Sequence, residues 1–205
     1  MSANIAMSAT SSEKRRMLVL FCSPHRAGHT GRLLQAFLER LPEDVEVTVY
    51  DAYRERPQPC LDCGYCTGKQ GCSQRDLDAF MEAFEQADFF VVASPVYYNA
   101  LPAPGKAVLD RFQRYFSARF ALGIRPPVAS PKRAALLLSC GSGERGGFLA
   151  VRSQLRRAFT VMNTELCGSV FAGGTDSAPL GEAAFLRAKR LAHKMAGAGD
   201  TYVKG

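Results

Sequence analysis

Three short apolar segments recur along the chain, at residues 17–22, 89–93 and 134–139. None of them alternates apolar with polar residues, which is typical of strands buried on both faces of a parallel sheet. Each is followed by a segment whose apolar residues recur every three or four positions, as in a helix with one buried face. Because parallel strands need crossover connections, we expect strands and helices to alternate along the whole chain.

Two further strands complete the alternation. Val45, Val47 and Val49 alternate with polar residues, which predicts a half-exposed strand at a sheet edge, and a last strand is expected over residues 165–171. Helical spacing predicts helices near residues 33–41, 77–84, 105–120, 148–162 and 185–195. The order is therefore βαβαβαβαβα, which predicts an α/β fold with a doubly wound five-stranded parallel sheet. With the second strand at an edge, the strand order is 2-1-3-4-5, the flavodoxin-like arrangement.

Polar residues predict how two of these helices begin. The Thr30 hydroxyl is expected to cap the first helix. Ser73 and Asp76 are expected to form a capping box ahead of the second helix.

Length and composition indicate one domain. The 205 residues are 47% apolar and 22% charged, which excludes disordered and collagen-like chains. Residues 1–13 are rich in Ser and Ala without periodicity and are expected to be a disordered leader, with the folded domain over 16–198. No apolar run approaches the roughly 20 residues of a membrane helix, and no secretory signal is recognisable. We therefore expect a cytoplasmic protein without a membrane partner.

The net charge of +7 raises the question of nucleic acid binding. The positive residues are scattered, and a cluster on the last helix reads as a solvated face. No zinc finger, RNP motif or helix-turn-helix pattern is present. A dianionic ligand or an acidic electron-transfer partner fits this charge, and no nucleic acid partner is expected.

The loop after the first strand has the composition of a phosphate site. In a doubly wound sheet, ligands bind beyond the carboxyl ends of the strands, where helix N-termini offer unpaired N–H groups. Hydroxyl, glycine and basic residues meet in this loop: Ser23, His25, Arg26, Gly28, His29 and Thr30. A single glycine excludes a Rossmann fingerprint, and the absence of Gly-Lys-Ser/Thr excludes a Walker loop.

The loops after the third and fourth strands meet the first loop at the same sheet edge. Backbone amides and two aromatic rings come from Ser94, Pro95, Val96, Tyr97, Tyr98 and Asn99. Cys140, Gly141 and Ser142 let the backbone approach a flat ligand closely. One loop for a phosphate and two for a planar polar ring describe an FMN site.

The same motifs resemble those of the NADPH-dependent FMN reductase group of flavodoxin-like proteins. The pattern Ser-Pro-x-x-x-Gly-x-Thr from Ser23 to Thr30 is similar to the phosphate loop of that family. Residues 94–97, through Lys106 and Asp110-Arg111, resemble the segment that lies against the isoalloxazine. One position departs from the family pattern, because His29 stands where the family usually has Asn.

Four cysteines, Cys60, Cys63, Cys66 and Cys72, lie in an irregular insertion over residues 57–73, after the second strand. In a non-secreted chain such a cluster indicates metal or redox chemistry before disulfides. Tight spacing with a longer last spacer suits thiolates around one [4Fe–4S] cluster. Zinc, which usually takes two separated Cys pairs, is disfavoured, although zinc, a disulfide and free redox thiols stay open as alternatives.

The cysteine pattern also resembles that of the iron–sulfur flavoproteins, a branch of the same superfamily that holds a [4Fe–4S] cluster after the second strand. The two resemblances together imply an FMN-dependent oxidoreductase in which the flavin performs the chemistry and no protein side chain acts as catalyst. They imply NAD(P)H or ferredoxin as electron donor and a small-molecule acceptor.

Two other classes of protein compete with this interpretation. A non-enzymatic electron carrier similar to flavodoxin is disfavoured, because flavodoxins resemble one another in being acidic and this chain is basic. A zinc-stabilised binding module on an inactive flavodoxin-like scaffold would be colourless when purified.

Aromatic residues at helical spacing also predict an oligomer. Phe112, Tyr115, Phe116 and Phe120 recur on one helix beside the flavin segment. Such a stripe is most often core, but one this large also fits a contact between copies. We expect a homodimer or homotetramer.

Overall fold

Five parallel strands form one sheet in the order β2-β1-β3-β4-β5. The computed structural model describes residues 14–197, so the expected leader over 1–13 lies outside the described residues. The strands are β1 (Arg15–Phe21), β2 (Val45–Asp51), β3 (Phe89–Pro95), β4 (Lys132–Ser139) and β5 (Thr164–Ala172). The predicted fold class and strand order are confirmed.

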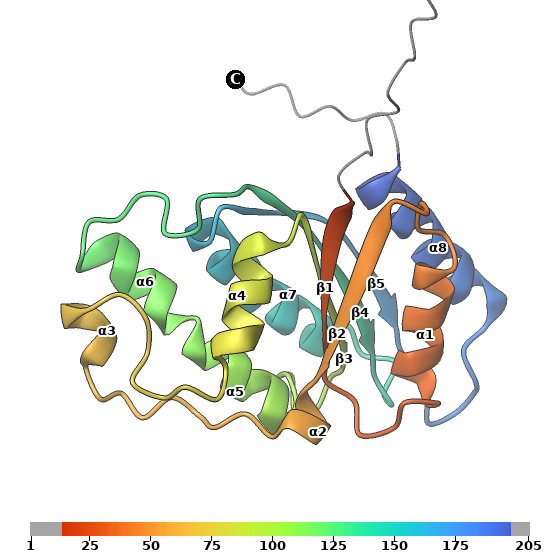
Figure 1. Cartoon of the computed structure of the whole chain (residues 1–205). Helices are drawn as coiled ribbons and strands as arrows, with labels where there is room; N and C mark the ends of the chain where they lie inside the picture. The colour runs from red at the N-terminus through yellow and green to blue at the C-terminus, as the bar shows by residue number, and fades with distance from the viewer. Residues whose placement is uncertain (1–13, 198–205) are drawn as a thin grey trace, which may run out of the picture.

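Helices cover both faces of the sheet (Figure 1). On one face lie α1 (His29–Leu38) and α8 (Glu182–Ala196). On the other lie α4 (Asp78–Gln86), α5 (Ala103–Arg111), α6 (Gln113–Phe120) and α7 (Gly146–Val161). Of two short helices after β2, α2 (Ala52–Glu55) directly follows the strand and α3 (Tyr65–Gly68) lies in the insertion. Within residues 14–197, no helix is long and apolar enough to cross a membrane.

Burial on both faces explains the unbroken apolar runs. In β1, Leu18 and Leu20 pack under α4 and α5, while Met17 and Val19 pack under α1 and α8. Successive side chains of a strand point to opposite faces, so each position needs an apolar residue. The edge strand β2 keeps one face partly open, as its alternating sequence predicts.

The two predicted helix caps are wrong. Gly28 is the N-cap of α1 and adds no side-chain hydrogen bond, because the Thr30 hydroxyl lies inside the helix and bonds the Ser139 hydroxyl at 2.7 Å. The capping box fails because α4 begins later, at Asp78. Ser73 instead lies with its hydroxyl 3.1 Å from the Cys63 sulfur.

The single helix predicted over 105–120 is two helices, α5 and α6, which meet at Phe112. The N–H of Phe112 donates to the Leu109 carbonyl at 3.2 Å, a tight three-residue turn that interrupts the α-helical pattern. The Phe112 ring is buried among those of Phe80, Phe84 and Tyr115. Packing of this ring therefore decides where the helix bends.

Lys132, at the start of β4, is a buried charge that closes the end of α4. Its ammonium group donates to the carbonyls of Glu85 and Ala87, both at 2.8 Å. These carbonyls lie at the C-terminal end of a helix, where the helix dipole favours a cation. Burial nevertheless lowers the pKa of Lys132 from its usual 10.5 to about 8, against the opposing effect of the carboxylates of Asp88 and Glu85.

This lowered pKa predicts a stability that rises in alkaline solution. Below about pH 8 the lysine is protonated in both the folded and the unfolded chain, and the cost of burying its charge is fully present. Between pH 8 and 10.5 the unfolded chain binds more protons, so the free energy of unfolding rises with pH. Relative to Lys132→Met, we expect wild type to gain on the order of 2–3 kcal/mol across this range, measured by urea unfolding. A pH-independent difference would contradict the assignment.

Candidate functional site

A cavity of about 630 Å³ opens at the carboxyl edge of the sheet, where the loops after four strands meet. The loop between β1 and α1 lines it with Ser23, His25, Gly28, His29 and Thr30. The segments after β3 and β4 line it with Pro95, Val96, Tyr97, Tyr98, Cys140, Gly141 and Ser142. The structure therefore brings most of the sequence-predicted cofactor residues to one cavity, in the size range of ligand pockets.

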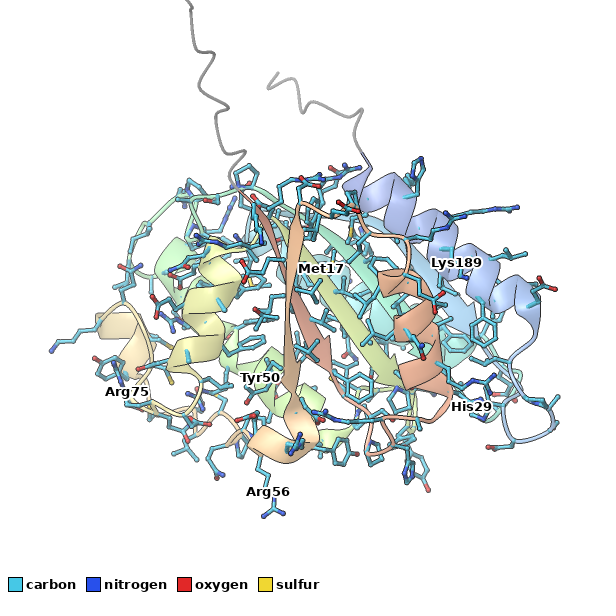
Figure 2. The ribbon with its side chains drawn as sticks, turned by 45° about the vertical axis from the view of Figure 1, so that its right-hand side comes forward. Met17, His29, Tyr50, Arg56, Arg75 and Lys189 are labelled. Carbon is cyan, nitrogen blue, oxygen red and sulfur yellow. The ribbon has the colours of Figure 1, made fainter. Side chains whose placement is uncertain are left out.

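The first turn of α1 forms one wall of this cavity (Figure 2, where His29 is labelled at the start of the helix). With Gly28 at the N-cap, no side chain accepts from the first N–H groups, which is the arrangement that binds anions. The turn is held close by Gly31, because a side chain there would overlap the Arg26 carbonyl. Sequence analysis missed Gly31, whose role depends on this approach of the backbone.

His29 presents a buried nitrogen without a partner. Its Nδ1 atom has no hydrogen-bond partner among the described residues. Beside it, the Ser23 hydroxyl accepts from the N–H of His25 at 3.2 Å. His29 lines the cavity, while this nitrogen is shielded from solvent beneath the cavity surface. A buried polar atom normally has a partner, so Nδ1 is an exception.

Three predicted residues lie outside the cavity lining. The Arg26 guanidinium pairs with the buried carboxylate of Asp51 at the end of β2, Nε to Oδ2 at 2.7 Å, so its charge already has a partner within the protein. Ser94 is buried in β3 and donates to the Pro95 carbonyl at 2.7 Å. Asn99 packs its side chain against Gly147, at the start of α7.

A two-residue turn presents the aromatic residues. Tyr97 and Ala100 exchange two backbone hydrogen bonds, of 3.0 and 2.9 Å. Tyr98 and Asn99 between them both have positive φ, the geometry of a type I′ turn, which asparagine tolerates well. Tyr97 is half exposed and Tyr98 fully exposed, so both rings lie at the open side of the cavity.

Sequence analysis missed three lining residues, Ser139, Thr175 and Asp176. The last two lie after β5, and the N–H groups of Thr175 and Asp176 donate to the carbonyls of Cys140 and Gly141. The Asp176 carboxylate lies where a side chain at Gly141 would project, so any side chain there would displace it. The rule that all parallel strands end at one edge would have included this fourth loop.

Lys106, Asp110 and Arg111, which the family resemblance assigned to the flavin segment, do not line the cavity. Lys106 and Asp110 form an ion pair with each other at 2.6 Å. Arg111 turns away to the residues around the cysteines. Cys22 is buried at the end of β1, which raises the pKa of its thiol to about 12, and it is inert packing against Gly105.

The four clustered cysteines lie in residues 58–76, here called the cysteine segment. All four are free thiols: Cys60 and Cys63 are exposed, and Cys66 and Cys72 are partly buried. The segment leaves the carboxyl end of β2 and docks on α6, where α3 and α6 lie side by side (Figure 1). The Cys66 thiol donates to the Ser117 hydroxyl of α6 at 3.4 Å.

The thiols as placed do not gather into a metal site. In the part of the chain that the structure describes, no three His, Cys, Asp or Glu side chains lie close enough to hold one metal ion. The hydrogen bond from Ser73 lowers the pKa of the Cys63 thiol, and so does a backbone hydrogen bond from Tyr65. Four cysteine thiols are suitable metal ligands. As placed, however, they lie too far apart to share one metal, so the cysteine segment would have to contract before a metal binds.

Comparisons with known proteins bear on this site. The family model described as NADPH-dependent FMN reductase matches residues 15–177. An iron-sulfur flavoprotein from Archaeoglobus fulgidus is 26% identical over 176 residues, covering 85% of this chain and 76% of that protein. One from Methanosarcina thermophila is 30% identical over 127 residues, covering 61% of this chain and 62% of that protein.

Solved structures share the fold. An NAD(P)H:quinone oxidoreductase from Methanothermobacter marburgensis has a TM-score of 0.69 at 21% identity, covering 91% of this chain and 98% of that one. An FMN-dependent NADH-azoreductase from Bacillus anthracis, in complex with FMN, has a TM-score of 0.66 at 13% identity, covering 89% and 100%. At these identities the likeness concerns the architecture of the chain.

Proposed function

The chain belongs to the NADPH-dependent FMN reductase family and is a flavin oxidoreductase, and we propose that it holds FMN in the cavity at the carboxyl edge of the sheet. Electrons would pass from NAD(P)H through that FMN to a small acceptor. The free thiols of the described chain fit a reducing compartment, the cytoplasm.

The observation that carries this proposal is the uncapped start of α1, whose first residues line the cavity. Helix N–H groups, the hydroxyls of Ser23 and Thr30 and the His29 ring would hold the phosphate end of FMN. The backbone of Cys140 to Ser142 would lie against the ring, with Tyr97 and Tyr98 toward solvent.

Bound FMN supplies the redox chemistry, taking up hydride and releasing electrons. The chain's own residues bind and orient it and exclude water from one side. The loop after β5 stiffens the Cys140–Ser142 wall through the N–H of Gly174, which donates to the Ser142 carbonyl at 2.8 Å.

A double variant, Ser23→Ala with Thr30→Val, tests the phosphate site. It removes two donors to a charged group, each worth about 1.5–3 kcal/mol, so we expect the FMN dissociation constant to rise at least about tenfold. Flavin fluorescence measures binding, and NAD(P)H oxidation at saturating FMN is expected to recover. Thr160→Val, on the exposed side of α7, is the matched control. An unchanged FMN dissociation constant in the double variant would contradict the proposed phosphate site.

Steady-state oxidation of NAD(P)H separates the enzyme from a non-enzymatic electron carrier. The basic net charge of +7 also fits an acidic electron donor such as a ferredoxin. Both donors are compatible with a cavity whose aromatic side is open.

We propose further that the cysteine segment takes up a [4Fe–4S] cluster through Cys60, Cys63, Cys66 and Cys72. The compact spacing of the four free thiols supports it, and so does the name of the two similar proteins, iron-sulfur flavoprotein. Since the thiols do not meet as placed, binding must draw the segment together.

Cys63→Ala tests the cluster, with Cys167→Ala as the control, because Cys167 lies on β5 away from the segment. After anaerobic reconstitution we expect wild type and Cys167→Ala to contain iron and acid-labile sulfide and Cys63→Ala to lack both. FMN affinity is expected to be equal in all three. Wild-type protein that binds FMN but contains no acid-labile sulfide would contradict the cluster proposal, and the cysteines would then be free thiols.

The proposed homodimer or homotetramer rests on an exposed apolar face. Phe116 and Phe120 of α6 are 47% and 56% exposed, with ring centroids 4.5 Å apart. Phe116 also lines a groove of about 290 Å³ between α7 and the junction of α5 with α6. Phe112 and Tyr115 of the predicted stripe belong instead to the core. An exposed aromatic pair beside a groove favours burial against a second copy.

Replacing both rings, Phe116→Ser with Phe120→Ser, is expected to shift the protein toward its 22.3 kDa monomer, measured by light scattering at micromolar concentration. Leu186→Ser, an equally exposed apolar residue on α8, is expected to leave the mass unchanged. A monomeric wild type would contradict the proposal.

A further inference from the structure

The two ends of the cysteine segment are held together by one buried guanidinium. Arg111, the last residue of α5, donates from Nη1 to the Gln58 carbonyl at 3.2 Å and to Asp76 Oδ1 at 2.9 Å. Its Nη2 donates to the Gln74 carbonyl at 2.8 Å. The acceptors stand before Cys60 and after Cys72, so this side chain closes the neck of the loop that carries all four cysteines.

Further hydrogen bonds cross the same neck. The N–H of Gln58 donates to Asp76 Oδ2 at 2.8 Å, and Gln74 Nε2 donates to the Pro59 carbonyl at 2.9 Å. Burial of Asp76 opposes its ionisation, but the hydrogen bonds from Gln58 and Arg111 outweigh that effect and lower its pKa. Both carboxylate oxygens of Asp76 thus accept a hydrogen bond, one of them from a charged guanidinium. Hydrogen bonds between charged groups are among the strong ones in proteins.

The Arg111 side chain makes these contacts while almost completely shielded from solvent. Its side chain is 1% exposed, and its Nε atom has no hydrogen-bond partner within the described chain. A buried arginine is costly unless its partners are fixed. The partners here are two backbone carbonyls and one carboxylate, all from the segment and none from the flavin cavity.

The segment has little else to fold it. Pro57 and Leu77, just outside the neck, are buried, but no residue from 58 to 76 is fully buried. A loop without apolar burial cannot offset the conformational entropy of its own ordering. The neck and the contact of α3 with α6 are therefore the restraints that place the thiols.

The neck is anchored to the helix that leaves the flavin cavity. α5 follows the Tyr97–Ala100 turn, has 9 residues and is therefore about 13 Å long. Its start packs through Gly105 against Cys22 at the end of β1, where a side chain at 105 would come within 2.5 Å of the sulfur. One rigid element thus has the cavity turn at its start and the cysteine neck at its end.

We propose that Arg111 is the positioning residue of the cysteine segment: it closes the neck before any metal binds and ties the four thiols to α5 at a set separation from the flavin cavity. This deepens the proposed metal-binding role of the segment and rests on it for its purpose, though the closed neck itself is independent of metal.

The test uses Asp76→Ala and Arg111→Lys in the full chain without added metal. A lysine cannot reach three acceptors as a planar fork does, and Asp76→Ala changes a side chain at the partly exposed rim of the neck. We expect amide exchange across residues 58–76 and alkylation of the half-buried Cys66 to quicken at least about tenfold in both. FMN affinity is expected to stay within about twofold.

Two matched controls accompany them. Asp78→Ala removes a neighbouring carboxylate that forms an ion pair with the exposed side chain of Arg75, and Arg119→Lys alters an arginine of α6 outside the neck. Both are expected to behave as wild type. Equal rates in Asp76→Ala and Asp78→Ala would overturn the proposal, and so would an equal acceleration at Cys140 and Cys167, which would mean general loosening.

Iron uptake separates this inference from the proposed cluster. If wild type takes up iron and sulfide, Asp76→Ala is expected to retain less of both than Asp78→Ala, and equal retention would overturn the positioning role. If wild type takes up none, the cluster proposal fails, and the exchange and alkylation rates alone decide whether Arg111 closes the neck.

Discussion

Burial of β1 and β3 on both faces is the constraint on which the rest of this structure depends. Strands covered by α1 and α8 on one side and by α4 to α7 on the other must run parallel, because each crossover helix returns the chain to the same starting edge. Every strand then ends at the opposite edge. Loops far apart in the sequence meet there without any contact that is specific to a ligand, and a cavity forms between them.

Within that cavity, internal partners select which polar groups are free for a ligand. Asp51 takes the Arg26 guanidinium, and Thr30 and Ser139 share a hydrogen bond across the floor. The groups left for a ligand are the N–H groups of the uncapped first turn of α1 and, beside them, the hydroxyls of Ser23 and Thr30, since only one hydroxyl of the Thr30–Ser139 pair donates in their shared hydrogen bond. The anion-binding character of the site therefore comes from backbone N–H groups and hydroxyls more than from an arginine.

A second polar centre lies on the other side of the sheet, joined to the first by α5. Figure 2 shows His29 at the start of α1 and Arg75 of the cysteine segment on opposite sides of the strands. Arg111, at the end of α5, donates hydrogen bonds to both ends of the cysteine segment, which has no buried core of its own. Through this residue α5 attaches the segment to the hydrophobic core of the domain.

Local patterns in the sequence determined the strands, their order and most of the cavity lining. Unbroken apolar runs and the alternation at Val45, Val47 and Val49 reflect burial, which acts on each residue according to its own face. The loops that follow such strands are then brought together by topology alone. Sequence analysis was wrong about side chains whose partners lie far away in the sequence. Thr30 bonds Ser139 instead of capping its helix, Phe112 bends a helix by packing among distant rings, and Arg111 reaches the cysteine segment instead of the flavin loop. Hydrogen bonds of this kind join residues tens of positions apart, and only the folded chain sets which donor meets which acceptor.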